Sequence, residues 1–129
     1  MYVGLETLPA ARLDAPGRRF LHDFASTQAG RPISDAAIYA AEATELLVAA
    51  IARSDGTRAS VAREVREARV RNGLIGSFRI AATGEAVPAR TAIVQLVTPG
   101  RSNAIQSYDG ARIVNVLTPP QGLLAGAGG

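Results

Sequence analysis

The stretch Arg53–Phe78, RSDGTRASVAREVREARVRNGLIGSF, decides the expected fold of this chain. Gly56 suits a left-handed position at the end of a helix, and Thr57 can cap the helix that follows. We predict the helix that Thr57 caps, the third in chain order, to run to about Val70. Its inner side is expected to hold the apolar residues Val61, Val65 and Ala68.

Strands and connections are predicted after this helix. Asn72-Gly73 should end the helix, because both residues favour turns over a helix interior. The following segments alternate between β-branched or aromatic runs and turn residues. The expected segments are the strand 74–80, the turn 82–85, the strand 90–97, the polar loop 98–109 and the strand 111–117.

The longest predicted helix lies upstream, from about Ser34 to Ser54. Ser34 or Asp35 can supply its N-cap. Apolar residues recur at spacings of three and four, which predicts one buried face. The predicted buried stripe is Tyr39, Ala43, Leu46, Leu47, Ala50 and Ile51.

In the first fifth of the chain we predict a strand followed by a helix. Residues 1–7 contain Tyr, Val and Leu and should form a strand that ends at Leu8-Pro9. Asp14 can cap a helix whose first turn holds Pro16, where no intrahelical bond is lost. One side of this region gathers Leu13, Phe20, Leu21 and Phe24.

Together these elements predict an α/β protein with three helices packed on a small mixed β-sheet. One N-terminal strand cannot bury three helices, so it should pair with the later strands or with another chain. We expect residues 1–118 to form one α/β domain and the glycine-rich residues 119–129 to form a flexible tail.

Composition narrows the classes of protein that fit. The 129 residues, 47% hydrophobic and 19% charged, are typical of one globular domain. No apolar run approaches the roughly 20 residues of a membrane helix, and no signal peptide is visible. All 14 basic residues are arginines, and they are scattered along the chain. The densest run, Arg63 to Arg71, has no interleaved aromatic residues, which favours a solvated helix face over a nucleic-acid site. The absence of cysteine excludes thiolate chemistry.

Few residues suggest catalysis or metal binding. His22 is the single histidine and Asp23 follows it, but neighbouring helix residues point about 100° apart, so we expect no oriented pair. Glu42 and Glu45 can share a helix face, yet the sequence supplies no third metal ligand nearby, and both are expected to face solvent. Gly73-Leu-Ile-Gly76 is best interpreted as a turn, because its interior is apolar. We therefore predict no enzyme, no cofactor and no metal.

The chain from about Tyr2 to Thr118 resembles the C-terminal portion of extracellular solute-binding proteins of the type I periplasmic-binding fold. The closest branch is the one that serves branched-chain amino acid ABC transporters. The resemblance rests on the joint order and spacing of three segments, Ile38–Ala43, Ser54–Arg58 and Gly73–Phe78, none of which is a catalytic signature.

This resemblance implies two α/β lobes with a small polar, amino-acid-like ligand between them, of which this chain would be an incomplete part. It assigns ligand contacts to the start of the tyrosine-containing helix, namely Ser34 and Asp35, with Tyr39 as a weaker candidate. A helix N-terminus suits a carboxylate or polar group. Ordinary capping by Ser34 and Asp35, and core packing of Tyr39, remain alternatives. Thr7–Pro9 would lie near a hinge.

The resemblance also implies an extracellular or periplasmic, lipoprotein-type parent that passes its ligand to an ABC permease or a sensor module. Such parents are roughly three times as long as this chain, and half of a clamshell cannot enclose a ligand. The alternative is an interaction module in which exposed apolar surface drives formation of a homodimer, with or without exchanged strands.

Overall fold

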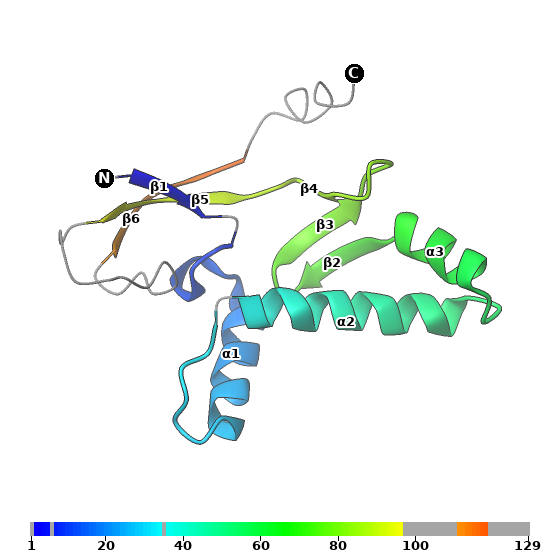
Figure 1. The fold of residues 1–129 in the computed structure, drawn as a ribbon, viewed down its shortest axis with the longest axis horizontal. Coiled ribbons are helices and arrows are strands. Elements are labelled where there is room, and N and C mark those ends of the chain that lie inside the picture. Colours follow the sequence, from blue (N-terminus) through cyan, green and yellow to red (C-terminus); the bar gives the residue numbers. More distant parts are fainter. Residues whose placement is uncertain (1, 6, 35, 97–110, 119–129) are drawn as a thin grey trace. The chain divides into compact units, whose positions relative to one another are not determined.

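In the computed structural model, residues 2–5, 7–34, 36–96 and 111–118 are described. They form three α-helices, one short 3-10 helix and six strands, so the predicted α/β class is confirmed (Figure 1). Among these residues, no helix combines the length and the apolar character that crossing a membrane requires. The predicted loop 98–109 and the predicted tail 119–129 lie outside the described residues.

The chain divides into two compact units. One contains Met1–Leu8 and Arg90–Gly129, and the other contains Pro9–Ala89. The backbone therefore passes between the units twice, once after Leu8 and once after Ala89. The first passage falls within Thr7–Pro9, the segment for which the sequence predicts a hinge.

The first unit is built on an antiparallel sheet with the strand order β1-β5-β6. Its strands are β1 (Tyr2–Leu5), β5 (Thr91–Leu96) and β6 (Ala111–Leu117). The central strand β5 carries Ala92, which is fully buried. The prediction that the N-terminal strand pairs with a later strand is confirmed, since β1 pairs with β5 from Tyr2↔Gln95 to Leu5↔Ala92.

The second unit combines all three helices with a separate sheet of order β2-β3-β4. The single mixed sheet expected from sequence is thus replaced by two antiparallel sheets. In chain order the elements are η1 (Ala10–Arg12), α1 (Ala15–Thr27), α2 (Ala36–Arg53), α3 (Arg58–Arg66), β2 (Arg69–Gly73), β3 (Gly76–Ile80) and β4 (Ala86–Val87).

The α2–α3 connection follows the sequence prediction closely. Gly56 adopts a φ of +85°, the left-handed region expected after a helix. The Thr57 side chain accepts a hydrogen bond of 3.2 Å from the Ser60 N–H, as an N-cap does. Asp14 also stands at the N-cap of α1, but its side chain makes no capping hydrogen bond.

The prediction that α3 continues to Val70 is wrong. The helix ends at Arg66, and β2 begins at Arg69. Residues 69–71 place an apolar side chain between two arginines, a period-2 pattern that fits a strand as well as a helix end. Asn72 then adopts a φ of +53° at a register shift before Gly73, so Asn72-Gly73 shapes the strand and does not stop the helix.

The buried face of α2 also differs from the predicted stripe. Ile38, Glu42 and Ala50 are buried, whereas Leu47 and Ile51 are 46% and 51% exposed. The helix is apolar or alanine-rich around most of its circumference. Periodicity therefore could not select the side that meets the rest of the unit.

The core of this unit is a junction of α1, α2 and the turn between β2 and β3. Gly17 of α1 is buried there, and a Cβ at this position would overlap the Leu74 carbonyl oxygen and approach Ile38 Cδ1 to 2.9 Å. Ile38 itself is 1% exposed. The absence of a side chain at Gly17 is what lets the three elements meet.

Candidate functional site

The predicted ligand-binding end of α2 is capped by Ser34. Its hydroxyl oxygen accepts a hydrogen bond of 3.3 Å from the Ala36 N–H, and its carbonyl oxygen accepts one of 2.9 Å from the Ala37 N–H. The residue is exposed. Ser34 thus satisfies the first free N–H groups of the helix while its hydroxyl remains accessible from solvent.

The other two predicted contacts differ in what the structure describes. Asp35 lies outside the described residues. Tyr39 belongs to the first turns of α2 and is partly buried, next to the fully buried Ile38. Ser34 and Tyr39 therefore share the same end of one helix. The roles predicted for them remain predictions.

Glu42 occupies a different environment from the predicted one. It is 4% exposed, and its Oε2 accepts a hydrogen bond of 3.1 Å from the Ile75 N–H in the β2–β3 turn. A Cβ on Gly73 would come within 2.5 Å of the same oxygen. The expectation of a solvent-facing Glu42 is wrong, because the turn supplies a backbone donor that the sequence alone did not reveal. Gly73 leaves the space that the carboxylate occupies.

The turn Gly73-Leu-Ile-Gly76 itself forms as predicted. Gly73 and Gly76 face each other in the β2–β3 hairpin, with Leu74 and Ile75 between them. Its inward-facing N–H group binds a carboxylate of its own chain. This turn is therefore a structural clamp on α2.

The His22–Asp23 pair is closer than the sequence predicted. His22 Nδ1 lies 3.2 Å from Asp23 Oδ1, so the two side chains do meet. Neighbouring residues leave a helix about 100° apart, but their flexible side chains can still bend toward each other beyond the helix surface. The side chains are 86% and 71% exposed. The pair lacks the enclosed setting of a catalytic dyad.

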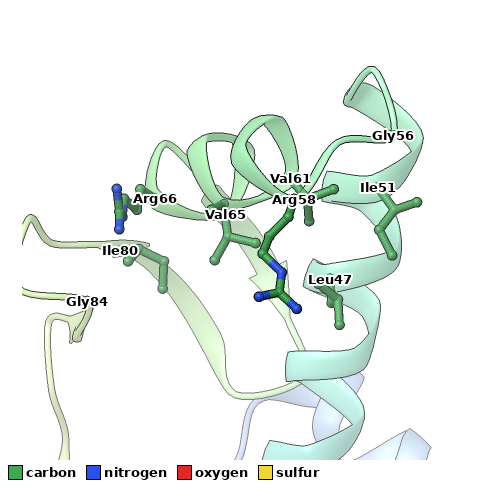
Figure 2. Close-up of a pocket in the computed structure, with 10 residues that line it drawn as sticks. Leu47, Ile51, Gly56, Arg58, Val61, Val65, Arg66, Ile80 and Gly84 are labelled. Carbon is green, nitrogen blue, oxygen red and sulfur yellow. The ribbon is translucent and has the colours of Figure 1, made fainter.

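A groove not predicted from the sequence lies at the opposite end of α2 (Figure 2). It has a volume of about 700 Å³. Its walls come from α2, α3, the end of β3 and the turn after β3. The lining residues are Leu47, Ile51, Gly56, Arg58, Val61, Ala62, Val65, Arg66, Ile80 and Gly84.

The groove combines an apolar floor with two cations. Figure 2 shows Val61 and Val65 of α3 facing the same space as Leu47 of α2 and Ile80 of β3. The side chains of Arg58 and Arg66 border this space and are exposed. Among the described residues, no carboxylate forms an ion pair with either arginine. The sequence signal was present in the four-residue spacings of α2 and α3, but it was interpreted as core.

A hydrogen-bond network fixes the helices that form this groove. Asp55 Oδ1 accepts bonds from the Thr57 hydroxyl at 2.7 Å and from the Thr57 N–H at 2.9 Å. These bonds, the hydroxyl first, hold the pKa of Asp55 below its ordinary value of 3.8. Arg53 of α2 and Glu64 of α3 add an ion pair at 3.3 Å. Polar contacts outside the groove thus connect α2 and α3 on both sides of the turn between them.

Comparison with models of protein families, with curated proteins and with solved structures finds no match to this chain. Its function is therefore argued from the residues and the geometry.

Proposed function

We propose that this chain is part of a solute-binding protein that captures a small, polar, amino-acid-like ligand for transport or sensing. The proposal joins the type I periplasmic-binding resemblance to one structural observation. The backbone passes between two compact units twice, and one passage coincides with the predicted hinge at Thr7–Pro9. Paired crossings are what a hinged two-lobe trap needs, because they let the lobes move without separating.

The accessible Ser34 at the N-terminus of α2 supports the assignment of a ligand contact. The helix dipole favours a carboxylate or another polar group at such an end. In the proposal, Ser34 and Asp35 contact the ligand directly, and Tyr39 borders it. The remainder of the binding cleft comes from segments of the parent protein outside this chain, and the parent docks to a permease or a sensor module.

Chemical-shift mapping on the 129-residue chain tests this proposal. Titration with a panel of amino acids should shift the amide signals of residues 34–39 at millimolar concentration, because an incomplete cleft encloses only part of a ligand. Ser34→Ala should reduce these shifts. Ser26→Ala, which removes an exposed hydroxyl bonded to the Asp23 carbonyl in α1, should not. Unchanged signals at residues 34–39 with every amino acid, or tight binding by the monomer, would refute the proposal.

Self-association is a second candidate function, favoured by a different observation. Strand β6 lies at the edge of its sheet, and in the described part of the chain it pairs only with β5. Val114 and Leu117 on this strand are 48% and 46% exposed. An open edge with exposed apolar residues is a template for pairing with a second copy.

Light scattering distinguishes this alternative. Association through β6 predicts a dimer that Val114→Lys converts to a monomer, because lysine on an edge strand opposes pairing. Val114→Thr keeps the β-branched shape and should leave the dimer intact. A monomeric mass for the unaltered chain at about 100 μM would contradict the second candidate.

A further inference from the structure

We propose that the groove between α2, α3 and β3 binds an acidic amphipathic helix of a separate protein. The groove lies at the C-terminal half of α2, about 20 Å along the helix axis from Ser34. It is therefore distinct from the proposed solute-binding end, and the inference does not depend on it.

The apolar lining identifies the kind of surface that would cover it. Leu47 and Ile51 are about half exposed, and the neighbouring Val48 is 59% exposed. On α3, Val61 and Val65 face the same groove. A row of aliphatic residues contributed by two helices accepts the apolar face of a third helix, as helix-in-groove complexes do.

The openness of the groove argues against a small molecule as the occupant. Good small-molecule sites bury roughly 70–90% of the ligand surface. Here Leu47 and Ile51 of one wall remain about half exposed to solvent. A helix roughly 10 Å in diameter covers both walls and can reach Val48, which lies beside the lining.

The charges at the groove determine the chemistry of this helix. Arg58 and Arg66 are eight residues apart on α3, so their backbone positions lie about 12 Å apart along the axis. Carboxylates seven or eight positions apart on one face of a partner helix have nearly the same separation, about 10–12 Å. A parallel or antiparallel helix beside α3 can therefore bring a carboxylate within reach of each of these long, exposed arginine side chains, with two apolar side chains between the carboxylates.

No helix in the described part of this chain has two exposed carboxylates seven or eight positions apart. The proposed occupant is therefore a separate protein and not a second copy of this chain. Glu42 of α2 is buried, leaving Glu45 as its exposed acid. Glu64 of α3 already binds Arg53. The 13-residue α1 contains one acid, Asp23, and two arginines. None of them presents two exposed carboxylates at the required spacing.

A labelled synthetic peptide tests the proposal on the full chain. The peptide is a helix of about 18 residues with two glutamates seven positions apart and leucines at the third and fourth positions between them. Fluorescence anisotropy should show saturable binding that weakens about tenfold when both glutamates become glutamine, and that weakens with added salt.

Variants of the groove provide the matching half of the experiment. Arg58→Glu combined with Arg66→Glu should reduce binding of the glutamate peptide more than tenfold and should favour a peptide with lysines at the same positions. Arg12→Glu combined with Arg19→Glu makes an equal charge change at exposed positions of η1 and α1 and should leave binding unchanged. Leu47→Asp should abolish binding, and circular dichroism should show that the helices remain.

Four outcomes would overturn the proposal. One is absence of peptide binding up to about 1 mM. Another is equal affinity for the glutamate and glutamine peptides. A third is preferential binding of decanoate over the peptide, with shifts of the Leu47 and Val65 signals, which would assign the groove to a small amphiphile. The fourth is a dimer that Leu47→Asp dissociates, which would assign the groove to a second copy.

Discussion

The large side chains in the two halves of α2 have opposite environments. In the N-terminal half, Ile38 is 1% exposed and Glu42 is 4% exposed, both at the junction with α1 and the β2–β3 turn. In the C-terminal half, Leu47 and Ile51 are 46% and 51% exposed and line the groove. The N-terminal half, with its buried carboxylate, is called the closed half; the C-terminal half, which buries Ala50 but exposes its large aliphatic residues, is called the open half.

This contrast shows that burial in α2 depends on what packs against each turn. A buried Glu42 is tolerated because the Ile75 N–H donates to it and Gly73 leaves it space. Leu47 and Ile51 stay about half exposed because no described segment of the unit covers them as the β2–β3 turn covers Glu42. The closed half should therefore control the stability of the fold, and the open half should control binding.

The largest expected effect is on the closed half, at Gly17. Gly17→Ala places a methyl group against the Leu74 carbonyl oxygen and 2.9 Å from Ile38 Cδ1, and this backbone carbonyl can give way only if the β2–β3 turn moves away from α1. We expect a loss of about 3 kcal/mol or more in the free energy of unfolding. Urea denaturation measures this, with the exposed Arg19→Ala of the same helix as the control. A change below about 1 kcal/mol would mean that the junction is loosely packed.

A smaller effect is expected at Glu42. Glu42→Ala removes the acceptor of the Ile75 N–H and leaves a cavity, which should cost about 2 kcal/mol. Glu45→Ala makes the same change three residues later at an exposed position and should alter stability by less than about 0.5 kcal/mol. Equal effects of the two substitutions in chemical denaturation would refute the clamp between α2 and the hairpin.

Some of the fold could be predicted because local chemistry determined it. Gly56 and Thr57 define a helix end and a helix start through their own backbone and side-chain preferences, and both occur as predicted. The Gly73–Gly76 turn also followed from local signals. The pairing of β1 with a later strand was predicted from the need to bury three helices, but those helices lie in the other unit, so the correct pairing has a different cause.

The errors arose where tertiary contacts decide. Arg69-Val70-Arg71 fits either a helix end or a strand, and only pairing with β3 makes it β2. The buried face of α2 was assigned from periodicity in a helix that is apolar on several sides. The donor that holds Glu42 comes from Ile75, 33 residues away, and no local pattern announces it.

The candidate sites were predictable to different degrees. Ser34 caps α2 as its residue type suggests, while its contact with a ligand remains a prediction. The groove was not predicted, because Leu47 and Ile51 were assigned to a core together with Ala50. Residues that line an open groove and residues that fill a core share the same spacing, so their sequence signals coincide.

The next effect concerns acid stability of the helices that form the open half. The pKa of Asp55 lies below 3.8 through its bonds to Thr57. The sign follows from linkage: the contribution to stability is present above the ordinary pKa and is lost as the pH falls through the lower folded value. Asp55→Asn should therefore flatten the decrease in stability below about pH 4. Thr57→Val, which removes the hydroxyl donor, should flatten it in part.

The acid-stability experiment compares urea denaturation at neutral pH and at several values below 4. Because Asp55 is exposed, we expect its effect to be smaller than those of the two substitutions at the junction. An unchanged slope in Asp55→Asn would show that the α2–α3 turn does not couple protonation to folding. The groove residues would then depend for their position on the apolar contacts of α3 and on the Arg53–Glu64 ion pair.

The smallest effect is expected in the open half itself. Ile51→Ala removes the same atoms as Ile38→Ala, but it removes them from a side chain that is 51% exposed instead of 1% exposed. We expect Ile51→Ala to change the free energy of unfolding by less than about 1 kcal/mol, against about 3 kcal/mol for Ile38→Ala. A loss at Ile51 as large as the loss at Ile38 would mean that the groove is already filled in the free protein. Equal losses of stability in Ile51→Ala and Ile38→Ala would thus contradict the contrast within α2. They would also contradict the open groove that the partner helix requires.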